Sequence, residues 1–364
     1  MSPLPPSHLR PPSSSYDAIL LVSFGGPERR EDVLPFLENV VRGKDVPRQR
    51  LLQVAERYEI FDGVSPINAQ NRALLAAVIG ELNRTGLRLP VYWGNRHWHP
   101  MLTDTVQAMA GDGVRRALAL VTAPFGSYPS CRQYLEDLAT ARQQVGANAP
   151  RIDKVRLFYN HPGFIEAAAD RVAAALDEKG DITHCRRDAP NISDVPFFRL
   201  VFSAHSIPIA MAERSPYERQ LRETCRLVVE RIGGQPPASP RPIPWELGYQ
   251  SRSGPPSQPW LGPDIRDRLR QLREEGVREV VIVPIGFVVE HMEVVYDLDI
   301  EVGQLCAELG INMVRAAVVG SHPRFVEMIR ELILERIDPA APRLASGPDG
   351  PWPDQCPGEC CPGP

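Results

Sequence analysis

Short apolar runs alternate with longer amphipathic stretches along this chain, and the alternation occurs in both halves. Strands are predicted at 18–24, 91–95, 116–125, 197–205, 245–250 and 279–288. Helices are predicted at 31–41, 72–84, 134–145, 216–232, 264–276 and 322–337. Strands that alternate with helices build parallel sheets covered by helices, so the sequence predicts an α/β fold. Because 364 residues exceed what one core usually supports, we expect two domains.

The two ends of the chain differ in composition from its body. Residues 1–15 are rich in proline and serine and contain no apolar run, which predicts a disordered leader and not a signal peptide. No stretch reaches the ~18 apolar residues of a membrane span. The basic residues are scattered, and the formal net charge is -4. We therefore expect a cytoplasmic protein with no nucleic-acid partner and no integral membrane segment.

His205 stands at the end of the strand predicted at 197–205. Pro208 follows three residues later and prevents the strand from continuing. Doubly wound sheets bind ligands at the carboxyl ends of their strands, so this imidazole is a candidate for chemistry in a cleft between two domains. A histidine that is satisfied inside the core, or that caps the next helix, fits the same pattern equally well.

Carboxylates recur along the segment that follows the last predicted strand. Glu290, Glu293, Asp297 and Glu301 would lie on one face of a helix, and no lysine or arginine interrupts them. A solvated acidic face is the ordinary explanation of such a stripe. Here His291 stands near its start and apolar neighbours predict partial burial, where a row of like charges is costly unless cations visit it. Carboxylates with imidazole favour a hard or borderline divalent metal.

Two turns in the first half are further candidates for ligand contact. FGGPE (24–28) lacks the full dinucleotide fingerprint, so nucleotide binding is weakly supported, but its glycines let a flat ligand approach the backbone. Ser65 precedes a proline and a helix in DGVSPINAQNR (62–72), where an ordinary helix cap is the simplest explanation.

The tail at 341–364 holds three cysteines in six residues, Cys356, Cys360 and Cys361. In a reducing cytoplasm, crowded cysteines indicate metal ligation more readily than disulfides. Three thiolates need a fourth ligand from elsewhere, and tetrathiolate sites hold zinc or an iron–sulfur cluster. A disordered tail with incidental cysteines is the alternative.

Several segments together resemble the ferrochelatase family over residues 16–340. They are LLVSFGGPE (20–28), FDGVSPINAQNR (61–72), LVFSAHSIP (200–208), YQSRSGPPSQPWLGP (249–263) and PIGFVVEHMEVVYDLDIE (284–301). The resemblance implies a lyase, a metal chelatase that inserts Fe2+ into a porphyrin during haem biosynthesis. The tail and the first two motifs are similar to the actinobacterial branch, whose members metallate coproporphyrin III.

The resemblance also implies a fold and a division of the chain. Two Rossmann-like, chelatase-type domains with four-stranded parallel sheets flanked by helices would enclose a porphyrin cleft. The N-terminal domain would span 16–160 and the C-terminal domain 161–322. The final helix, at 323–340, would pack back on the first domain, and the cysteine-rich tail would follow it.

Site residues carry over position by position. The family's invariant histidine falls on His205 and its metal-site glutamate on Glu293, which makes these two the expected catalytic residues and Fe2+ ligands. Asp297 and Glu301 would form a relay for iron or protons. The residues expected to contact the porphyrin are Arg57, Tyr58, Ser65, Tyr134 and Phe24. Some coproporphyrin enzymes have a tyrosine able to ligate product iron where this chain has Phe24, so product iron must be held differently here.

Members of the family with tail cysteines hold a [2Fe-2S] cluster, and Cys131 matches the internal ligand that joins Cys356, Cys360 and Cys361. We expect a monomer that takes coproporphyrin III and ferrous iron and hands its product to a coproheme decarboxylase. Three alternatives stay open: a protoporphyrin IX ferrochelatase, a cobalt or nickel chelatase, and a haem- or metal-binding sensor or carrier without turnover.

Overall fold

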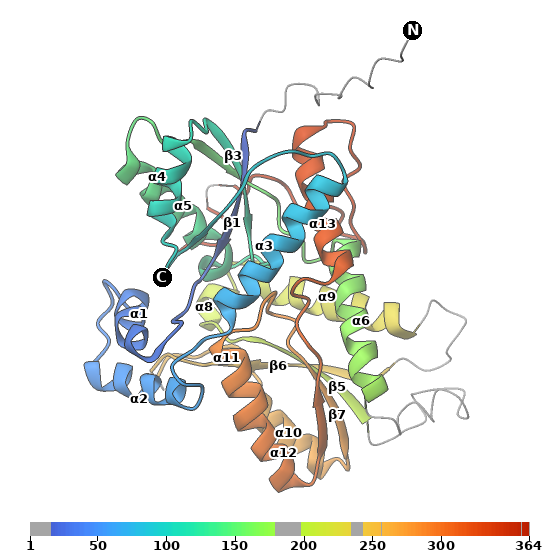
Figure 1. Ribbon diagram of the computed structural model, residues 1–364. Coiled ribbons are helices and arrows are strands. Elements are labelled where there is room, and N and C mark those ends of the chain that lie inside the picture. The colour runs from blue at the N-terminus through green and yellow to red at the C-terminus, as the bar shows by residue number, and fades with distance from the viewer. Residues whose placement is uncertain (1–15, 179–197, 234–242, 256, 358, 364) are drawn as a thin grey trace.

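The computed structural model describes residues 16–178, 198–233, 243–255, 257–357 and 359–363. The leader expected at 1–15 lies outside these ranges, and so does Cys185, a cysteine of the body that is not among the expected cluster ligands. Within them the strands form two sheets (Figure 1). The first sheet contains β1 (Ala18–Ser23), β2 (Val91–Asn95), β3 (Arg116–Val121) and β4 (Arg151–Lys154). The second contains β5 (Phe198–His205), β6 (Trp245–Gln250), β7 (Glu279–Val283) and β8 (Asn312–Arg315).

The two sheets have the same topology. Their strand orders are β2-β1-β3-β4 and β6-β5-β7-β8, and every pairing is parallel. The central strands β1 and β5 are almost entirely buried, which explains why they are continuous apolar runs without alternation. The expectation of two four-stranded parallel sheets is confirmed.

Helices cover both sheets. The first half contributes η1 (Arg30–Asp32), α1 (Val33–Val40), α2 (Arg48–Glu59), α3 (Ile67–Arg84), α4 (Leu102–Gly111), η2 (Tyr128–Arg132) and α5 (Gln133–Val145). The second half contributes α6 (Pro162–Glu178), α8 (Ile209–Ala212), α9 (Tyr217–Gly233), α10 (Ile265–Glu274), α11 (Met292–Val294), η4 (Val295–Val302), α12 (Gly303–Leu309) and α13 (Pro323–Ile337). None of the helices in the described ranges is long and apolar enough to cross a bilayer.

Two strands end several residues before their predicted boundaries. β3 stops at Val121 and β7 at Val283, although apolar residues continue beyond both. Pro124 and Pro284 lie just past these ends, and a proline cannot donate a hydrogen bond to the sheet. The residues beyond each strand therefore become loops at the carboxyl edge, where ligands bind in doubly wound sheets.

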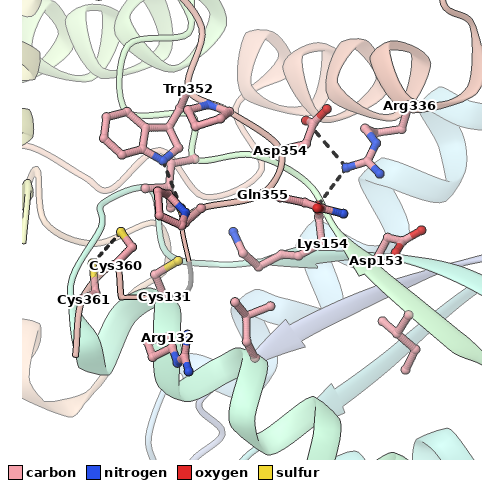
Figure 2. Close-up of a pocket in the computed structure, with 16 residues that line it drawn as sticks. Cys131, Arg132, Asp153, Lys154, Arg336, Trp352, Asp354, Gln355, Cys360 and Cys361 are labelled. Carbon is pink, nitrogen blue, oxygen red and sulfur yellow. Dashed lines mark hydrogen bonds and ion pairs between the residues drawn. The ribbon is translucent and has the colours of Figure 1, made fainter. Parts of the chain in front are cut away.

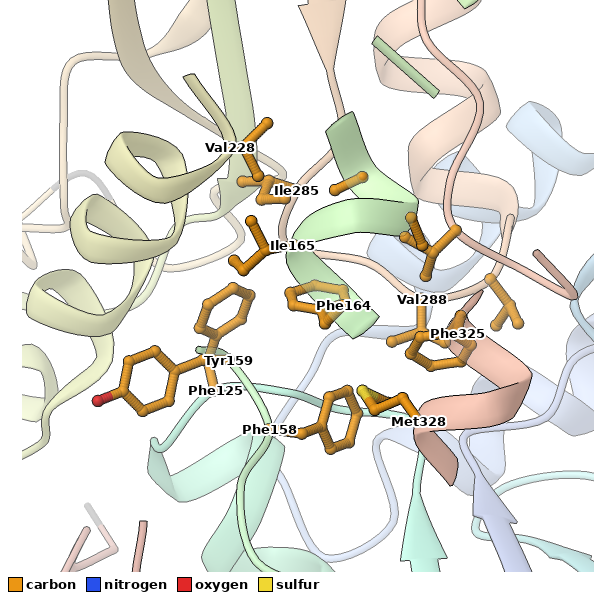
Figure 3. Packing of buried hydrophobic residues seen from close by; sticks show 14 of the residues in the cluster. Phe125, Phe158, Tyr159, Phe164, Ile165, Val228, Ile285, Val288, Phe325 and Met328 are labelled. Atoms are coloured by element: carbon orange, nitrogen blue, oxygen red, sulfur yellow. The ribbon is translucent and has the colours of Figure 1, made fainter. Parts of the chain in front are cut away.

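One hydrophobic core runs through both halves of the molecule. Phe158 packs edge to face on Phe164 and Phe325, which are tilted against each other, and the ring centroids are 5.8 to 6.1 Å apart (Figure 3). They come from the link after β4, from α6 and from α13, respectively. Buried residues of both sheets belong to this same core, so α13 holds the two halves together.

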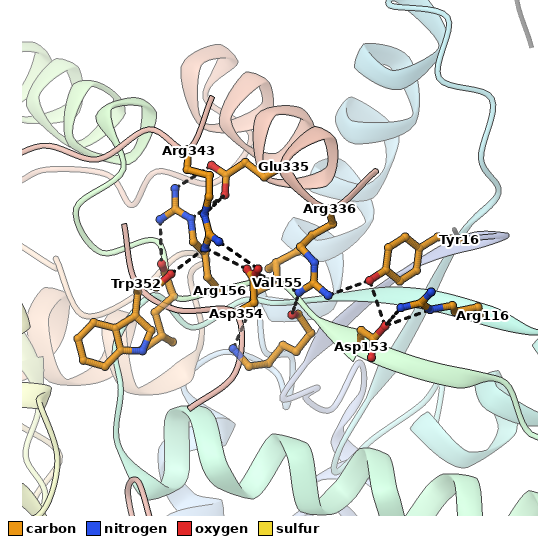
Figure 4. Close-up of polar contacts among 12 residues, drawn as sticks. Tyr16, Arg116, Asp153, Val155, Arg156, Glu335, Arg336, Arg343, Trp352 and Asp354 are labelled. Carbon is orange, nitrogen blue, oxygen red and sulfur yellow. Dashed lines mark hydrogen bonds and ion pairs between the residues drawn. The ribbon is translucent and has the colours of Figure 1, made fainter. Parts of the chain in front are cut away.

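The chain after α13 folds back over the first half. Arg156, just beyond β4, forms a bidentate ion pair with Glu335 of α13, with N···O distances of 2.7 and 2.8 Å, and both side chains are 1% exposed (Figure 4). The same guanidinium donates a hydrogen bond to the carbonyl of Leu344, at 2.6 Å. This buried ion pair therefore fixes the start of the tail to the body of the molecule.

Candidate active site

The ends of two strands and the start of a helix meet at the predicted catalytic residues. His205 ends β5, and its partner in the parallel register is Gln250, the last residue of β6. The Gln250 amide donates a hydrogen bond to the carbonyl of Glu293, at 3.0 Å, and accepts one from the Ser203 hydroxyl. His205 and Glu293 face each other, with 3.6 Å between the imidazole Nε2 and the carboxylate Oε2. The structure thus brings the two residues together.

The hydrogen bonds of His205 decide which ring nitrogen is free. Nδ1 lies within hydrogen-bond reach of the Ser206 carbonyl, and a carbonyl can only accept. Neutral His205 therefore carries its proton on Nδ1 and presents the lone pair of Nε2 toward Glu293. With a third of its side chain exposed, the imidazole can accept a proton from a ligand or bind a cation.

The carboxylate stripe is shorter than predicted. His291 is extended, with φ -149°, so the helix begins only at Met292 and Glu290 lies outside it. Glu290 instead accepts a hydrogen bond from Arg315, at 2.9 Å. From Val295 the predicted α-helix is a π-helix, η4, a form that is rare and concentrates at functional sites.

Asp297 and Glu301 follow Glu293 along η4 and meet cations from two other elements. Arg57 of α2 lies 3.6 Å from Asp297 and 3.8 Å from Glu301, and Arg266 of α10 lies 3.3 Å from Glu301. The Ser251 hydroxyl donates a hydrogen bond to Asp297. Burial, with the nearby Glu293 charge, raises the pKa of Asp297 to about 6. This carboxyl is therefore poised to exchange a proton near neutral pH.

Arg57 and Tyr58 approach this stripe from α2. The Arg57 guanidinium lies 4.6 Å above the centre of the Tyr296 ring. Tyr58 is buried and shares a small hydrophobic cluster with Phe36 and Met292, the residue before Glu293. Arg57 is engaged with carboxylates of the stripe, so its guanidinium shares its charge between them and any ligand.

The other three residues expected to contact a porphyrin, Phe24, Ser65 and Tyr134, belong to the first half of the chain. Phe24 packs against His97, with ring centroids 4.5 Å apart. Tyr134 is buried under the guanidinium of Arg96, 4.5 Å from its ring centre, and the same guanidinium lies 5.8 Å from the Phe24 ring. Ser65 is buried beside Gly26, where an added Cβ would come within 2.8 Å of the serine Cβ. Glycine is therefore required at 26 for the turn to approach Ser65.

Four residues of this site were missed at the level of sequence: Arg96, Gln250, Ser251 and Arg266. Gln250 ends β6 and Ser251 directly follows it, so the strand-end argument that found His205 could have found them. Arg96 follows β2 in the same way. Arg266 lies within a helix whose basic residues alternate with acidic ones, and nothing in the sequence distinguishes it.

The predicted cysteines gather at a separate place. Cys131, Cys356, Cys360 and Cys361 line one cavity of about 300 Å³ between η2, β4 and the tail (Figure 2). The thiols of Cys360 and Cys361 are 3.5 Å apart, and Cys356 is hydrogen-bonded to Cys131. That hydrogen bond, more than any other contact, lowers the pKa of Cys356, so a thiolate is stabilised there.

These cysteines fit a tetrathiolate group in number and chemistry. They are not spaced as ligands of a single ion, since the described part of the chain holds no group of three or more His, Cys, Asp or Glu set for a metal. Trp352 donates an indole N–H to the Cys356 sulfur at 3.4 Å, and Lys154 and Arg132 line the same cavity. Cationic and N–H groups of this kind suit an anionic tetrathiolate.

Comparison with known proteins identifies the family. The model of the ferrochelatase family matches residues 16–337. A ferrochelatase of Rhodopirellula baltica is 49% identical over 99% of this chain and 95% of its own length. A coproporphyrin III ferrochelatase of Frankia alni is 49% identical over 96% of this chain and 87% of its own, and one of Streptomyces griseus is 45% identical over 98% and 96%.

A solved structure supports the fold alone. SirB from Bacillus subtilis with Fe3+ is 13% identical and superposes with a TM-score of 0.50 over 90% of this chain and 98% of its own. Three observations lead to one conclusion. The two parallel sheets have the same topology, and His205 and Glu293 face each other at the carboxyl edge of the second sheet. The family model also matches most of the sequence. The chain belongs to the ferrochelatase family, and it is a metal chelatase.

Proposed function

We propose that this protein inserts Fe2+ into coproporphyrin III to give coproheme. The observation that carries the proposal is the facing pair of His205 and Glu293, held 3.6 Å apart at the carboxyl edge of the second sheet. The choice of porphyrin is supported by the names of relatives, among them those from Frankia alni and Streptomyces griseus. A protoporphyrin IX ferrochelatase is the second candidate, because the Rhodopirellula baltica relative is named only as a ferrochelatase.

The reaction releases two pyrrole protons for each Fe2+ that enters the ring. In its neutral form, His205 presents the lone pair of Nε2, which suits the removal of a pyrrole proton or the binding of the incoming ion. Glu293, half exposed on the same edge, provides a carboxylate for the other role. The proximity of the two groups lets the imidazolium that forms be stabilised by the carboxylate charge.

Asp297 and Glu301 extend this chemistry into the protein. We infer that they carry protons or iron along η4, because each carboxylate lies near the next and a cation accompanies them. A pKa of about 6 lets Asp297 take up and release a proton without a large barrier. Arg57 and Arg266 keep the charge of the stripe from accumulating.

The porphyrin wall is proposed at Arg57, Tyr58, Ser65, Tyr134 and Phe24. Coproporphyrin carries four propionates, and guanidinium groups bind carboxylates bidentately. Gly25 and Gly26 let a flat ring approach the backbone next to Phe24. Phenylalanine has no atom that binds iron, so the product's iron would be held from the side of His205.

We further propose that Cys131, Cys356, Cys360 and Cys361 hold a [2Fe-2S] cluster. When bound, such a group supplies a one-electron redox centre on four thiolates. Trp352 would orient the Cys356 sulfur, and Lys154 and Arg132 would offset the negative charge. The visible and electron paramagnetic resonance (EPR) spectra of protein purified without oxygen test this assignment.

The activity test mixes oxygen-free protein with Fe2+ and either coproporphyrin III or protoporphyrin IX and follows the porphyrin absorbance. We expect rapid metallation of coproporphyrin III, and a loss of about 100-fold or more in His205→Ala and Glu293→Gln with porphyrin binding retained. Glu308→Gln, an exposed glutamate on α12, is the matched control and should keep wild-type rates.

The other outcomes point to the alternatives. Faster turnover of protoporphyrin IX would overturn the substrate but keep the reaction, and a preference for Co2+ or Ni2+ would overturn the metal. Tight porphyrin binding with no metallation by any metal would favour a sensor or carrier. Wild-type insertion by His205→Ala would contradict the proposed role of that residue.

A further inference from the structure

The first turn of α9 makes contacts in three directions. The Tyr217 hydroxyl donates a hydrogen bond to the backbone carbonyl of His205, at 2.9 Å. Gln220 accepts a hydrogen bond from the backbone N–H of Gly126, at 2.7 Å, in the loop that leads into η2 and Cys131. Arg219, on the exposed side of the same turn, forms an ion pair with Asp349 of the tail. One helical turn thus touches the catalytic strand, the first half and the tail.

The ion pair between Arg219 and Asp349 connects α9 to the part of the tail that contains the cysteines. Asp349 also accepts a hydrogen bond from the Tyr159 hydroxyl, at 2.9 Å. The Trp352 ring packs edge to face on Tyr159, with centroids 6.1 Å apart, and lies 5.9 Å from the Arg219 guanidinium. Its indole N–H reaches the Cys356 sulfur, at 3.4 Å. A continuous series of contacts therefore joins Cys356 to the backbone of His205.

These contacts are tight on the inner side. Tyr217, Gln220 and Tyr159 are buried. A Cβ added to Gly126 would come within 2.9 Å of Leu157 and Pro216. Close packing of this kind transmits displacement, because neighbouring groups have no free space in which to relax. The His205 carbonyl is hydrogen-bonded to this turn, and the imidazole projects from that same residue.

We propose that the first turn of α9, formed by Tyr217, Arg219 and Gln220, is a positioning element that couples the cysteine tail to His205. The proposal rests on the proposed role of His205 in metal insertion. Its residues touch neither iron nor porphyrin. They fix the backbone from which the imidazole projects, so a change at the tail alters the reach of Nε2 toward its substrate.

A double-mutant cycle between the two ends of the turn tests the coupling. Tyr217→Phe removes only the hydroxyl that holds the His205 carbonyl, and Asp349→Ala removes the partner of Arg219. Each is expected to lower kcat for Fe2+ insertion about five-fold, with KM for coproporphyrin III within about two-fold, since residues in one network of contacts couple on this scale. The double variant should be no slower than the slower single variant. Arg222→Ala is the control, because Arg222 pairs with Glu218 inside α9.

Hydrogen exchange gives a readout that does not depend on activity. In Tyr217→Phe and in Asp349→Ala the backbone amides of 203–207 should exchange faster than in the wild type, and in Arg222→Ala they should not. Arg219→Gln cuts the same contact from the helix side and should reproduce Asp349→Ala, which guards against a folding defect in one variant.

Two results would overturn the coupling. One is a double variant whose loss equals the product of the single losses. The other is unchanged exchange at 203–207 when Asp349 is replaced. If wild-type protein fails to metallate any porphyrin, the proposed function fails instead, and the exchange experiment still decides whether the tail reaches His205.

Discussion

Asp297 has surroundings that differ from those of an ordinary surface carboxylate. It is buried, it accepts a hydrogen bond from Ser251, and its nearest cation, Arg57, is 3.6 Å away. Burial and the Glu293 charge raise its pKa, whereas Ser251 and Arg57 oppose the rise. The raising effects are larger, and the carboxyl changes its charge near pH 6.

The pH dependence of metal insertion follows from this balance. A relay needs Asp297 as a carboxylate, and a raised pKa means that the carboxylate is lost at a higher pH than usual as the solution is acidified. We therefore expect kcat to fall as pH decreases through about 6. Asp297→Asn should be slow at every pH, and its kcat should not show this fall on the acidic side of the pH profile (the acidic limb).

Removing the charge of Arg57 provides a second test of the role of Asp297. Arg57→Gln deletes a charge that lowers the pKa of Asp297, so the acidic limb should move to higher pH while its shape is kept. An unchanged limb in Asp297→Asn would assign the titration to another group.

The elements differ in how well they can be predicted from sequence. Central strands such as β1 and β7 are apolar because they are buried on both faces, so the apolar run alone locates them. The edge strands β4 (RIDK) and β8 (NMVR) are short and polar, and no periodicity identifies them. Helix α2 was missed for the same reason, because only Leu51 and Tyr58 of its twelve residues are buried.

The candidate site divides in a similar way. Residues that directly follow strands, such as His205, could be placed from the sequence because strand ends share one edge of a sheet. The position of its partner, Glu293, depends on where the helix after β7 begins. The extended backbone conformation of His291 sets that start at Met292. The approach of Arg57 to Asp297 arises from packing between distant elements, so no local pattern contains it.

The tail is an element without regular secondary structure, and single contacts define it. Trp352 donates the only indole N–H that reaches a sulfur among the described contacts. Hydrogen bonds to a thiolate ligand stabilise the reduced, more negative form of a cluster and raise its reduction potential. Trp352→Phe keeps an aromatic ring beside Tyr159 and Arg219 but removes this donor. We therefore expect Trp352→Phe to lower the reduction potential of the proposed [2Fe-2S] cluster in an EPR-monitored titration.

Trp260→Phe is the control for that titration, since its indole lies on the exposed loop before α10 and bonds to Gln258. It should leave the potential unchanged. Equal potentials in wild type and Trp352→Phe would show that the N–H of Trp352 does not act on the cluster. Absence of any cluster signal in the wild type would contradict the proposed cluster itself.

At the scale of the whole molecule, α13 and the chain beyond it connect the two halves, each of which is built on its own sheet. α13 packs on α3 and α6, and its Glu335 pairs with Arg156 from the link between the sheets. The tail then passes Arg156, Tyr159 and Arg219 before it reaches the cysteines. Stability of the assembled halves and placement of the tail therefore depend on the same buried cation (Figure 4).

That dependence predicts a large loss of stability when the pair is broken. Arg156→Met removes the bidentate partner of buried Glu335 and leaves it only the longer contact with Arg343, at 3.9 Å, and removing one partner of a buried pair costs about 3–5 kcal/mol. Replacing both residues, in Arg156→Met with Glu335→Met, removes the uncompensated charge and should recover much of the loss. The free energy of unfolding, from denaturant titration followed by near-ultraviolet circular dichroism, measures both.

The recovery should stay incomplete, for a reason specific to this site. Arg156 also donates hydrogen bonds to the carbonyls of Leu157 and Leu344, and methionine cannot replace them. Arg48→Met provides the matched control, because that arginine is 73% exposed and its ion pair with Glu38 is worth about 1 kcal/mol or less. A double variant as unstable as Arg156→Met alone would mean that these carbonyl contacts, and not the pairing of charges, hold the tail to the core.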